Sequence, residues 1–141
     1  MLEAIEPQEL VSELAELCGE LQKESGVSCR FVRMGEPRGL DVERASHLFY
    51  IAHEAARNAL RHARPTEIEI GLTSLAERLE LSIMDNGCGT PESGRGLTGM
   101  GLRIMAHRSE LIGGLFSVAP GPLAGTRVTC TVVLPPARPA A

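Results

Sequence analysis

Apolar residues recur at helical spacing in three parts of the chain. Residues 7–24 carry a leucine at every third or fourth position, and Gly26 follows as a stop signal. The longest helical pattern covers residues 42–63, directly after a candidate capping residue, Asp41, and a third pattern covers about residues 102–112. The stripe expected to face the core of the long helix consists of Val42, Ala45, Phe49, Ala52, Ala56 and Leu60.

Strict alternation of apolar and polar residues predicts two adjacent strands at 66–73 and 77–84, joined by a short connection as a hairpin. Three further apolar runs, at 27–33, 115–119 and 126–134, are typical of strands. Five strands, mostly antiparallel, and three helices predict an α+β fold. We expect a two-layer sandwich in which the helices cover one face of a mixed sheet.

The charge and the cysteines limit the possible partners. A formal net charge of -4 argues against the basic face that binds nucleic acid or anionic lipid, so we expect no nucleic acid and no direct membrane contact. No apolar run approaches the ~20 residues of a membrane span, and the N-terminus does not resemble a signal peptide. The four cysteines form no CxxC pair, which favours reduced thiols in the cytoplasm. One domain is expected over residues 1–135, followed by a disordered tail at 136–141.

The run HEAARNALRHA at 53–63 carries the first candidate chemistry. Glu54 and Asn58 are four residues apart and share a helix face, with Arg61 and His62 close to it. A carboxylate, an amide oxygen and cations in this order fit a hydrated Mg²⁺ and phosphates, although a solvated helix face gives the same pattern. A zinc-protease HExxH motif is excluded because Arg57 stands where the second histidine would be.

The second candidate is DNGCG, which directly follows a predicted strand. The carboxylate of Asp85 can accept a hydrogen bond from an exocyclic amine such as that of adenine, and Gly87 and Gly89 allow a ligand to approach the backbone. An ordinary Asp-Asn-Gly turn is the alternative interpretation. Gly125 and Thr126, at the start of the last strand, by themselves indicate only a turn.

The glycine-rich run GRGLTGMG, at 94–101, is the third candidate. A dinucleotide-binding GxGxxG is excluded because about ten loop residues separate it from the preceding strand, and a Walker loop is excluded because no Gly-Lys-Ser/Thr is present. Gly99, Met100 and Gly101 stand where a helix begins, and the free N–H groups and dipole of a helix start favour phosphate. A plain glycine linker remains the alternative.

The order HEAARNALRHA, DNGCG, GMGL and GTRV resembles the N box and glycine boxes of the histidine-kinase ATPase superfamily, which also contains gyrase B and MutL. The chain looks most like the ATP-binding catalytic domain of two-component sensor histidine kinases of the nitrate-sensor and desaturase-sensor type. The resemblance covers about residues 7–135 and implies the two-layer α/β fold, ATP and Mg²⁺.

The resemblance also implies roles for single residues. Asn58 would coordinate Mg²⁺, with Glu54 beside it as the catalytic polar or basic group, and Asp85 would bind the adenine amine. The residues that would line the ATP site beside these are Arg61, His62, Gly87, Gly89, Gly99, Met100, Gly101, Leu102 and Thr126. Residues 90–98 would form a mobile lid.

The phosphoacceptor helix of such kinases is not recognisable around any of the four histidines. We therefore expect residues 1–26 to lead in from a separate dimerisation and phosphohistidine domain, and a response regulator to receive the phosphoryl group. The location expected is cytoplasmic, in a parent protein that can be membrane-anchored. The alternatives are a serine kinase of the anti-sigma-factor type on the same fold, and a nucleotide-dependent interaction module without catalysis.

Overall fold

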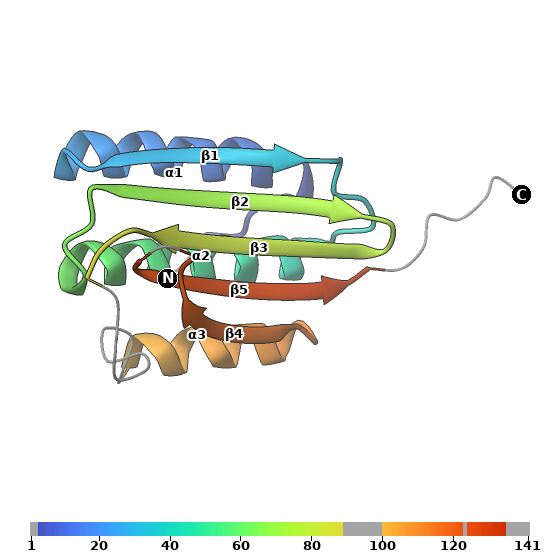
Figure 1. Cartoon of the computed structure of the whole chain (residues 1–141). Helices are drawn as coiled ribbons and strands as arrows, with labels where there is room; N and C mark the ends of the chain where they lie inside the picture. The colour runs from blue at the N-terminus through green and yellow to red at the C-terminus, as the bar shows by residue number, and fades with distance from the viewer. Residues whose placement is uncertain (1–2, 89–99, 123, 135–141) are drawn as a thin grey trace, which may run out of the picture.

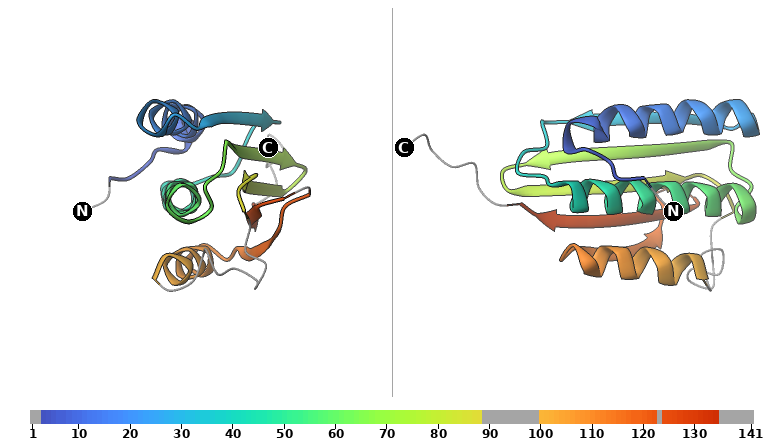
Figure 2. Two further views of the ribbon diagram at one scale, coloured as in Figure 1. Left: turned by 60° about the vertical axis from the view of Figure 1, so that its left-hand side comes forward. Right: turned by 180° about the vertical axis from the view of Figure 1, so that it is seen from behind.

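A computed structural model describes residues 3–88, 100–122 and 124–134, which form a five-stranded sheet with three helices on one face (Figures 1 and 2). The helices are α1 (Leu10–Ser25), α2 (Val42–His62) and α3 (Met100–Leu111), and a short 3-10 turn, η1 (Pro7–Glu9), precedes α1. The strands are β1 (Ser28–Met34), β2 (Glu67–Leu75), β3 (Arg78–Asp85), β4 (Leu115–Pro120) and β5 (Thr126–Val133). The expected α+β sandwich is confirmed. The expected lid at 90–98, Gly89, Gly99 and the tail lie outside the described residues.

The sheet has the strand order β1-β2-β3-β5-β4 and is mixed, as expected. Only the β1–β2 pair is parallel, so α2 forms the crossover that joins these two strands. β2 and β3 form the predicted hairpin, in which Leu75 faces Arg78 across a two-residue turn. Alternation places Ile68, Ile70 and Leu72 of β2 in the core, and it leaves Glu67 and Glu69 on the opposite, open face.

The helical layer packs on the sheet through one continuous apolar core. All four leucines of the α1 pattern, Leu10, Leu14, Leu17 and Leu21, are buried, so α1 is part of the same packed unit as the sheet. Gly26 ends α1 in the left-handed conformation, and Asp41 caps α2 by accepting a hydrogen bond from the Arg44 N–H at 2.8 Å.

The predicted core stripe of α2 is partly wrong. Val42 is exposed, and Phe49 and Leu60 are only partly buried. The buried face is wider than a stripe because α2 lies between α1 and α3 as well as on the sheet (Figure 2). It consists of Ala45, Leu48, Ile51, Ala52, Ala55, Ala56, Asn58 and Ala59. Most of these side chains are small, which lets the helix approach its neighbours closely.

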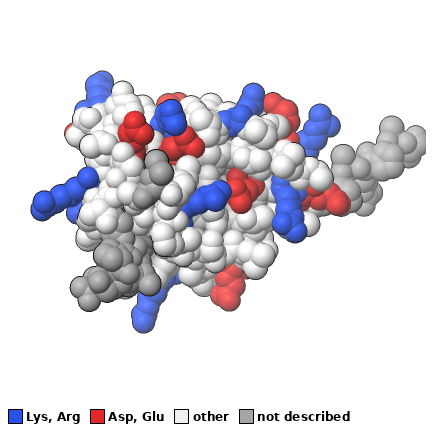
Figure 3. Space-filling model, in the orientation of Figure 1, with Lys and Arg blue, Asp and Glu red and all other residues white. Residues whose placement is uncertain are grey.

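The open face of the sheet carries charges of both signs, interspersed with uncharged residues (Figure 3). Arg30, Glu69, Met84 and Arg127 stand in register across four strands of this face. Arg30 pairs with Glu69 at 2.8 Å, and Arg127 pairs with Glu80 at 3.3 Å. Because both pairs remain partly exposed to solvent, each contributes at most about 1 kcal/mol to stability. None of the helices in the described ranges has the length and apolar character needed to cross a membrane.

The β2–β3 turn supplies a test of the fold. Ala76 has a φ of 54°, a left-handed conformation that is costly for any residue with a side chain. We expect Ala76→Gly to increase the free energy of unfolding by about 0.5–1 kcal/mol, since glycine adopts this conformation without the steric cost. Urea titration measures the change. Glu77→Gly is the matched control: Glu77 has no positive φ, so its replacement is expected to destabilise the chain, and equal effects of the two would contradict the turn geometry.

Candidate functional site

The first part of the site lies on α2, where Glu54 and Asn58 are one turn apart. Asn58 is a polar residue inside the core, with 5% of its surface exposed. One terminal nitrogen of Arg61 donates a hydrogen bond to the Asn58 side-chain oxygen at 3.0 Å, and it lies 3.4 Å from a carboxylate oxygen of Glu54. Three of the residues predicted from the HEAARNALRHA run therefore form one hydrogen-bonded group.

The start of α3 lies directly against this group. A Cβ atom added to Gly101 would lie 2.6 Å from Nδ2 of Asn58 and 2.9 Å from Oε2 of Glu54, closer than real Cβ contacts. Position 101 therefore requires glycine because a side chain does not fit there. Backbone conformation is not the reason, since the φ of Gly101 is not positive. The contact places the positive end of the α3 dipole beside Glu54, Asn58 and Arg61, which suits an anionic group such as phosphate.

The second part of the site is at the end of β3. Asp85 has the same strand parity as the buried Ile83, so its side chain is on the helix-facing side of the sheet. The backbone N–H of Gly87 donates to the Asp85 carboxylate at 2.8 Å, and the backbone N–H of Thr126 also donates to it. Burial raises the pKa of Asp85 above its usual value, and the two N–H groups only partly oppose that rise. A carboxylate held half-buried in this way can accept a hydrogen bond from a ligand.

Gly125 and Gly87 let the backbone pack tightly around Asp85. Gly125 has a φ of 83°, and a Cβ there would collide with the Asp85 carbonyl oxygen. A Cβ on Gly87 would collide with the carbonyl oxygen of Ala63, at the C-terminal end of α2. These two close approaches explain why Gly-Thr follows the last loop and why Asp-Asn-Gly ends β3.

Asn86 is a structural residue of the site that the sequence interpretation missed. Its side-chain oxygen accepts hydrogen bonds from the backbone N–H groups of Thr66 and Glu67, both at 2.9 Å, and its amide donates to the Thr66 hydroxyl at 2.9 Å. The N–H of Cys88 donates to the Ala63 carbonyl at 2.8 Å. Together these bonds fix the loop after Asp85 to the end of α2 and the start of β2. The signal available in the sequence was an asparagine in a turn, where its side chain commonly bonds to backbone.

The structure separates the predicted residues into two groups and leaves some outside both. Thr126 is buried, and its backbone N–H donates to Asp85. His62 and Met100 are exposed, and Leu102 is partly buried at the start of α3. No side-chain hydrogen bond in the described part of the chain joins His62 or Met100 to the Glu54–Asn58–Arg61 group.

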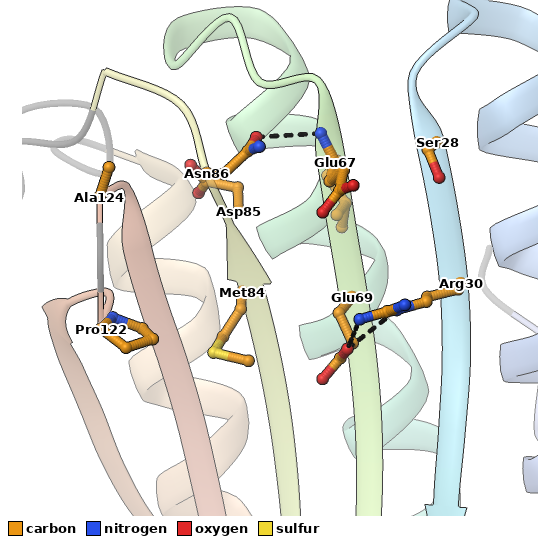
Figure 4. A pocket seen from close by; sticks show the side chains of 10 residues that line it. Ser28, Arg30, Glu67, Glu69, Met84, Asp85, Asn86, Pro122 and Ala124 are labelled. Carbon is orange, nitrogen blue, oxygen red and sulfur yellow. Dashed lines mark hydrogen bonds and ion pairs between the residues drawn. The ribbon is translucent and has the colours of Figure 1, made fainter.

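A pocket of about 280 Å³ borders Asp85 and Asn86 from the open face of the sheet (Figure 4). Its floor includes Met84 and the Arg30–Glu69 ion pair, and Pro122 and Ala124 form its other side. By strand parity Met84 and Glu69 are on the opposite side of the sheet from the Asp85 carboxylate. The pocket is therefore separate from the polar group between α2 and α3.

The described residues contain no group of three or more histidine, cysteine or acidic side chains that could hold a metal ion. The oxygens of Asn58 and Glu54 nevertheless suit Mg²⁺, which accepts one or two protein oxygens and takes its other ligands from phosphates and water. The donor set between α2 and α3 therefore fits a metal that arrives with a phosphate ligand, and it does not fit a metal held by protein alone.

Comparison with known proteins identifies one family and several relatives that agree with each other. Residues 43–137 match the family described as histidine kinase-, DNA gyrase B-, and HSP90-like ATPase. The chain is 30% identical over 116 residues to the nitrate/nitrite sensor protein NarX of Escherichia coli, covering 82% of this chain and 19% of that protein. It is 38% identical over 92 residues to the sensor protein VraS of Staphylococcus saprophyticus, covering 65% of this chain and 25% of that protein. The chain thus spans a quarter or less of the length of these relatives.

Among solved structures, the chain is similar to the ATP binding domain of PrrB from Mycobacterium tuberculosis. The TM-score is 0.75 with 25% sequence identity, and the match covers 89% of this chain and 94% of that one. The match therefore extends over most of both chains.

The raised pKa of Asp85 has a consequence for stability. A carboxyl group whose folded pKa is above its unfolded value binds more protons when folded, so stability falls as pH rises through the interval between the two values. Asp85→Asn removes the charge but keeps an oxygen for the Gly87 N–H. We expect the variant to be more stable than the wild type near pH 7 and equal to it at a pH low enough to protonate Asp85. Urea titration of both proteins between pH 3.5 and 7.5 measures the difference in their free energies of unfolding. If that difference does not increase with pH, the Asp85 carboxylate is not desolvated.

Proposed function

This chain belongs to the family of histidine kinase-, DNA gyrase B- and HSP90-like ATPases as an ATP-binding domain of the histidine kinase type, and from that premise we propose how its residues bind Mg-ATP and serve phosphotransfer. The observation that carries the proposal is the half-buried Asp85 carboxylate at the end of β3. It is held by two backbone N–H groups and retains capacity to accept a further hydrogen bond.

Asp85 binds the adenine ring in this proposal. Its carboxylate accepts a hydrogen bond from the exocyclic amine of adenine, with Thr126 and Gly87 fixing the carboxylate in place. Guanine presents a carbonyl oxygen at the corresponding position, which would face the carboxylate and be repelled by it. The site therefore selects adenine nucleotides by charge and hydrogen-bond direction.

The group between α2 and α3 binds the phosphate end. Asn58 and Glu54 supply the oxygens for Mg²⁺, the N–H groups at the start of α3 around Gly101 face the phosphates, and Arg61 adds a positive charge. Bound Mg²⁺ neutralises charge on the phosphate oxygens. The contribution of the chain is to position the γ-phosphoryl group and to hold Glu54 next to it.

The acceptor proposed is a histidine on a separate helical dimerisation domain of the parent protein, from which a response regulator receives the phosphoryl group. The sensor proteins among the relatives support this two-component assignment over a serine kinase of the anti-sigma-factor type. We propose a cytoplasmic location for the domain, where ATP is available.

Nucleotide selectivity tests the proposal. Calorimetric titration should show that the wild type prefers ATP to GTP. Asp85→Asn should weaken ATP binding by about 5- to 150-fold and narrow the preference, because losing a charged hydrogen bond costs roughly 1–3 kcal/mol. Wild-type binding of GTP as tight as that of ATP would contradict the role of Asp85.

Asp41→Asn is the control for this experiment. It removes the same charge from an aspartate at the start of α2, and asparagine caps a helix about as well as aspartate. ATP binding of this variant should equal that of the wild type. If Asp41→Asn loses as much ATP affinity as Asp85→Asn, the effect is due to net charge and not to the position of Asp85.

A further inference from the structure

The hydrogen bond between Arg61 and Asn58 occupies the oxygen that the proposed function gives to a metal. Nη2 of Arg61 donates to Oδ1 of Asn58 at 3.0 Å and lies 3.4 Å from Oε2 of Glu54, so one cationic nitrogen bridges both oxygens. We propose that Arg61 is a built-in substitute for the divalent cation in the nucleotide-free chain, and that it must leave Asn58 before a metal can be coordinated there. This inference rests on the proposed function for the identity of the metal site.

Competition follows from the limited space at this point. Asn58 is almost fully buried, and among the described residues Glu54, Arg61 and Gly101 lie against its side-chain amide. A single carbon atom added at Gly101 would lie 3.2 Å from Oδ1 of Asn58 and 2.9 Å from Oε2 of Glu54. A guanidinium and a hydrated metal ion therefore compete for the same two oxygens in this proposal.

The arrangement also explains the orientation of the Asn58 amide. Arg61 has only donors, so it fixes the oxygen of the amide toward the cation position and turns the nitrogen toward Gly101. The same contact neutralises Glu54, whose side chain is three-quarters buried with 25% exposed. Arg61 therefore prepares the two oxygens for a cation while it excludes a free one.

Release of Arg61 needs a better acceptor than an amide oxygen. The Arg61 side chain is 60% exposed and long enough to turn away from Asn58 without movement of the α2 backbone. Phosphate oxygens offer a charged, two-point partner for the guanidinium, which is the geometry that arginine binds most strongly. A nucleotide would thus draw Arg61 away and bring the metal in the same event, so binding of the metal alone is suppressed.

The test uses Mn²⁺ without nucleotide as the probe. Paramagnetic broadening of ¹⁵N-labelled protein detects weak occupancy, and the signals to follow are the Asn58 side-chain amide and the Gly101 N–H. We expect Arg61→Met to show half-broadening at about tenfold lower Mn²⁺ concentration than the wild type, equivalent to about 1.4 kcal/mol, the scale of a charged hydrogen bond. Arg61→Gln, which is also uncharged, should behave like Arg61→Met and serves if the latter does not fold.

Arg57→Met is the matched control. Arg57 lies one turn earlier on α2 and pairs with Glu24 at 3.3 Å, so this variant loses the same charge without touching Asn58. Its Mn²⁺ dependence should equal that of the wild type. If the Arg57 and Arg61 variants gain equal affinity for Mn²⁺, the effect is one of net charge and the proposal is overturned. The proposal is also overturned if neither Arg61 variant gains affinity for Mn²⁺.

The outcome is independent of the nucleotide experiment. If wild type binds ATP selectively but Arg61→Met gains no Mn²⁺ site, the substitute-cation proposal fails and the proposed function stands. If Arg61→Met gains the site but the wild type shows no preference for ATP, the competition at Asn58 stands and the adenine role of Asp85 fails.

Discussion

The close approach of α2 to its neighbours is the constraint on which the site depends. Five alanines, Ala45, Ala52, Ala55, Ala56 and Ala59, are buried along this helix. Small side chains bring its axis near the sheet and near α3, and Gly101 completes the contact from the α3 side. At that distance the side chain of Asn58 is buried in the interface between α2 and α3, and its oxygen accepts a hydrogen bond from the Arg61 guanidinium. Larger residues at these positions would widen the gap and return Asn58 to water.

The opposite end of the site is held by hydrogen bonds rather than by packing. Asp85 is only half-buried, but the loop around it is fixed by the Asn86 side chain, by the Cys88–Ala63 bond and by glycines that remove steric conflict. This arrangement keeps a desolvated carboxylate in place, even though desolvation works against folding at neutral pH. The hydrogen bonds from Gly87 and Thr126 offset part of the desolvation cost of the carboxylate. A ligand that donates a further hydrogen bond would offset more of it.

The helices and strands were predictable because each has a buried face with a clear period. The leucines of α1 and the alternating residues of the β2–β3 hairpin have one dominant packing partner, and their predicted positions match the structure. The core face of α2 was mispredicted because three partners surround that helix, so a single stripe underestimates its burial. The order of the motifs indicated Glu54, Asn58 and Asp85, and helical spacing placed Arg61 close to Asn58. No pattern could show that Arg61 bonds to the Asn58 oxygen or that Asn86 closes the loop. Those contacts depend on side-chain positions fixed by tertiary packing.

The two helices that form the proposed phosphate site are buried to different extents. α2 contributes eight residues to the buried set, whereas the described α3 contributes only Met105 and Ser109. Local opening in proteins follows such differences, so the backbone amides of α3 should exchange with solvent through partial unfolding that leaves α2 intact. Gly101 belongs to α3, the helix expected to open more easily, and Asn58 belongs to α2, the more stable helix that it contacts. We therefore expect the two halves of the proposed phosphate site to belong to different cooperative units, which a ligand that bridges them would join into one.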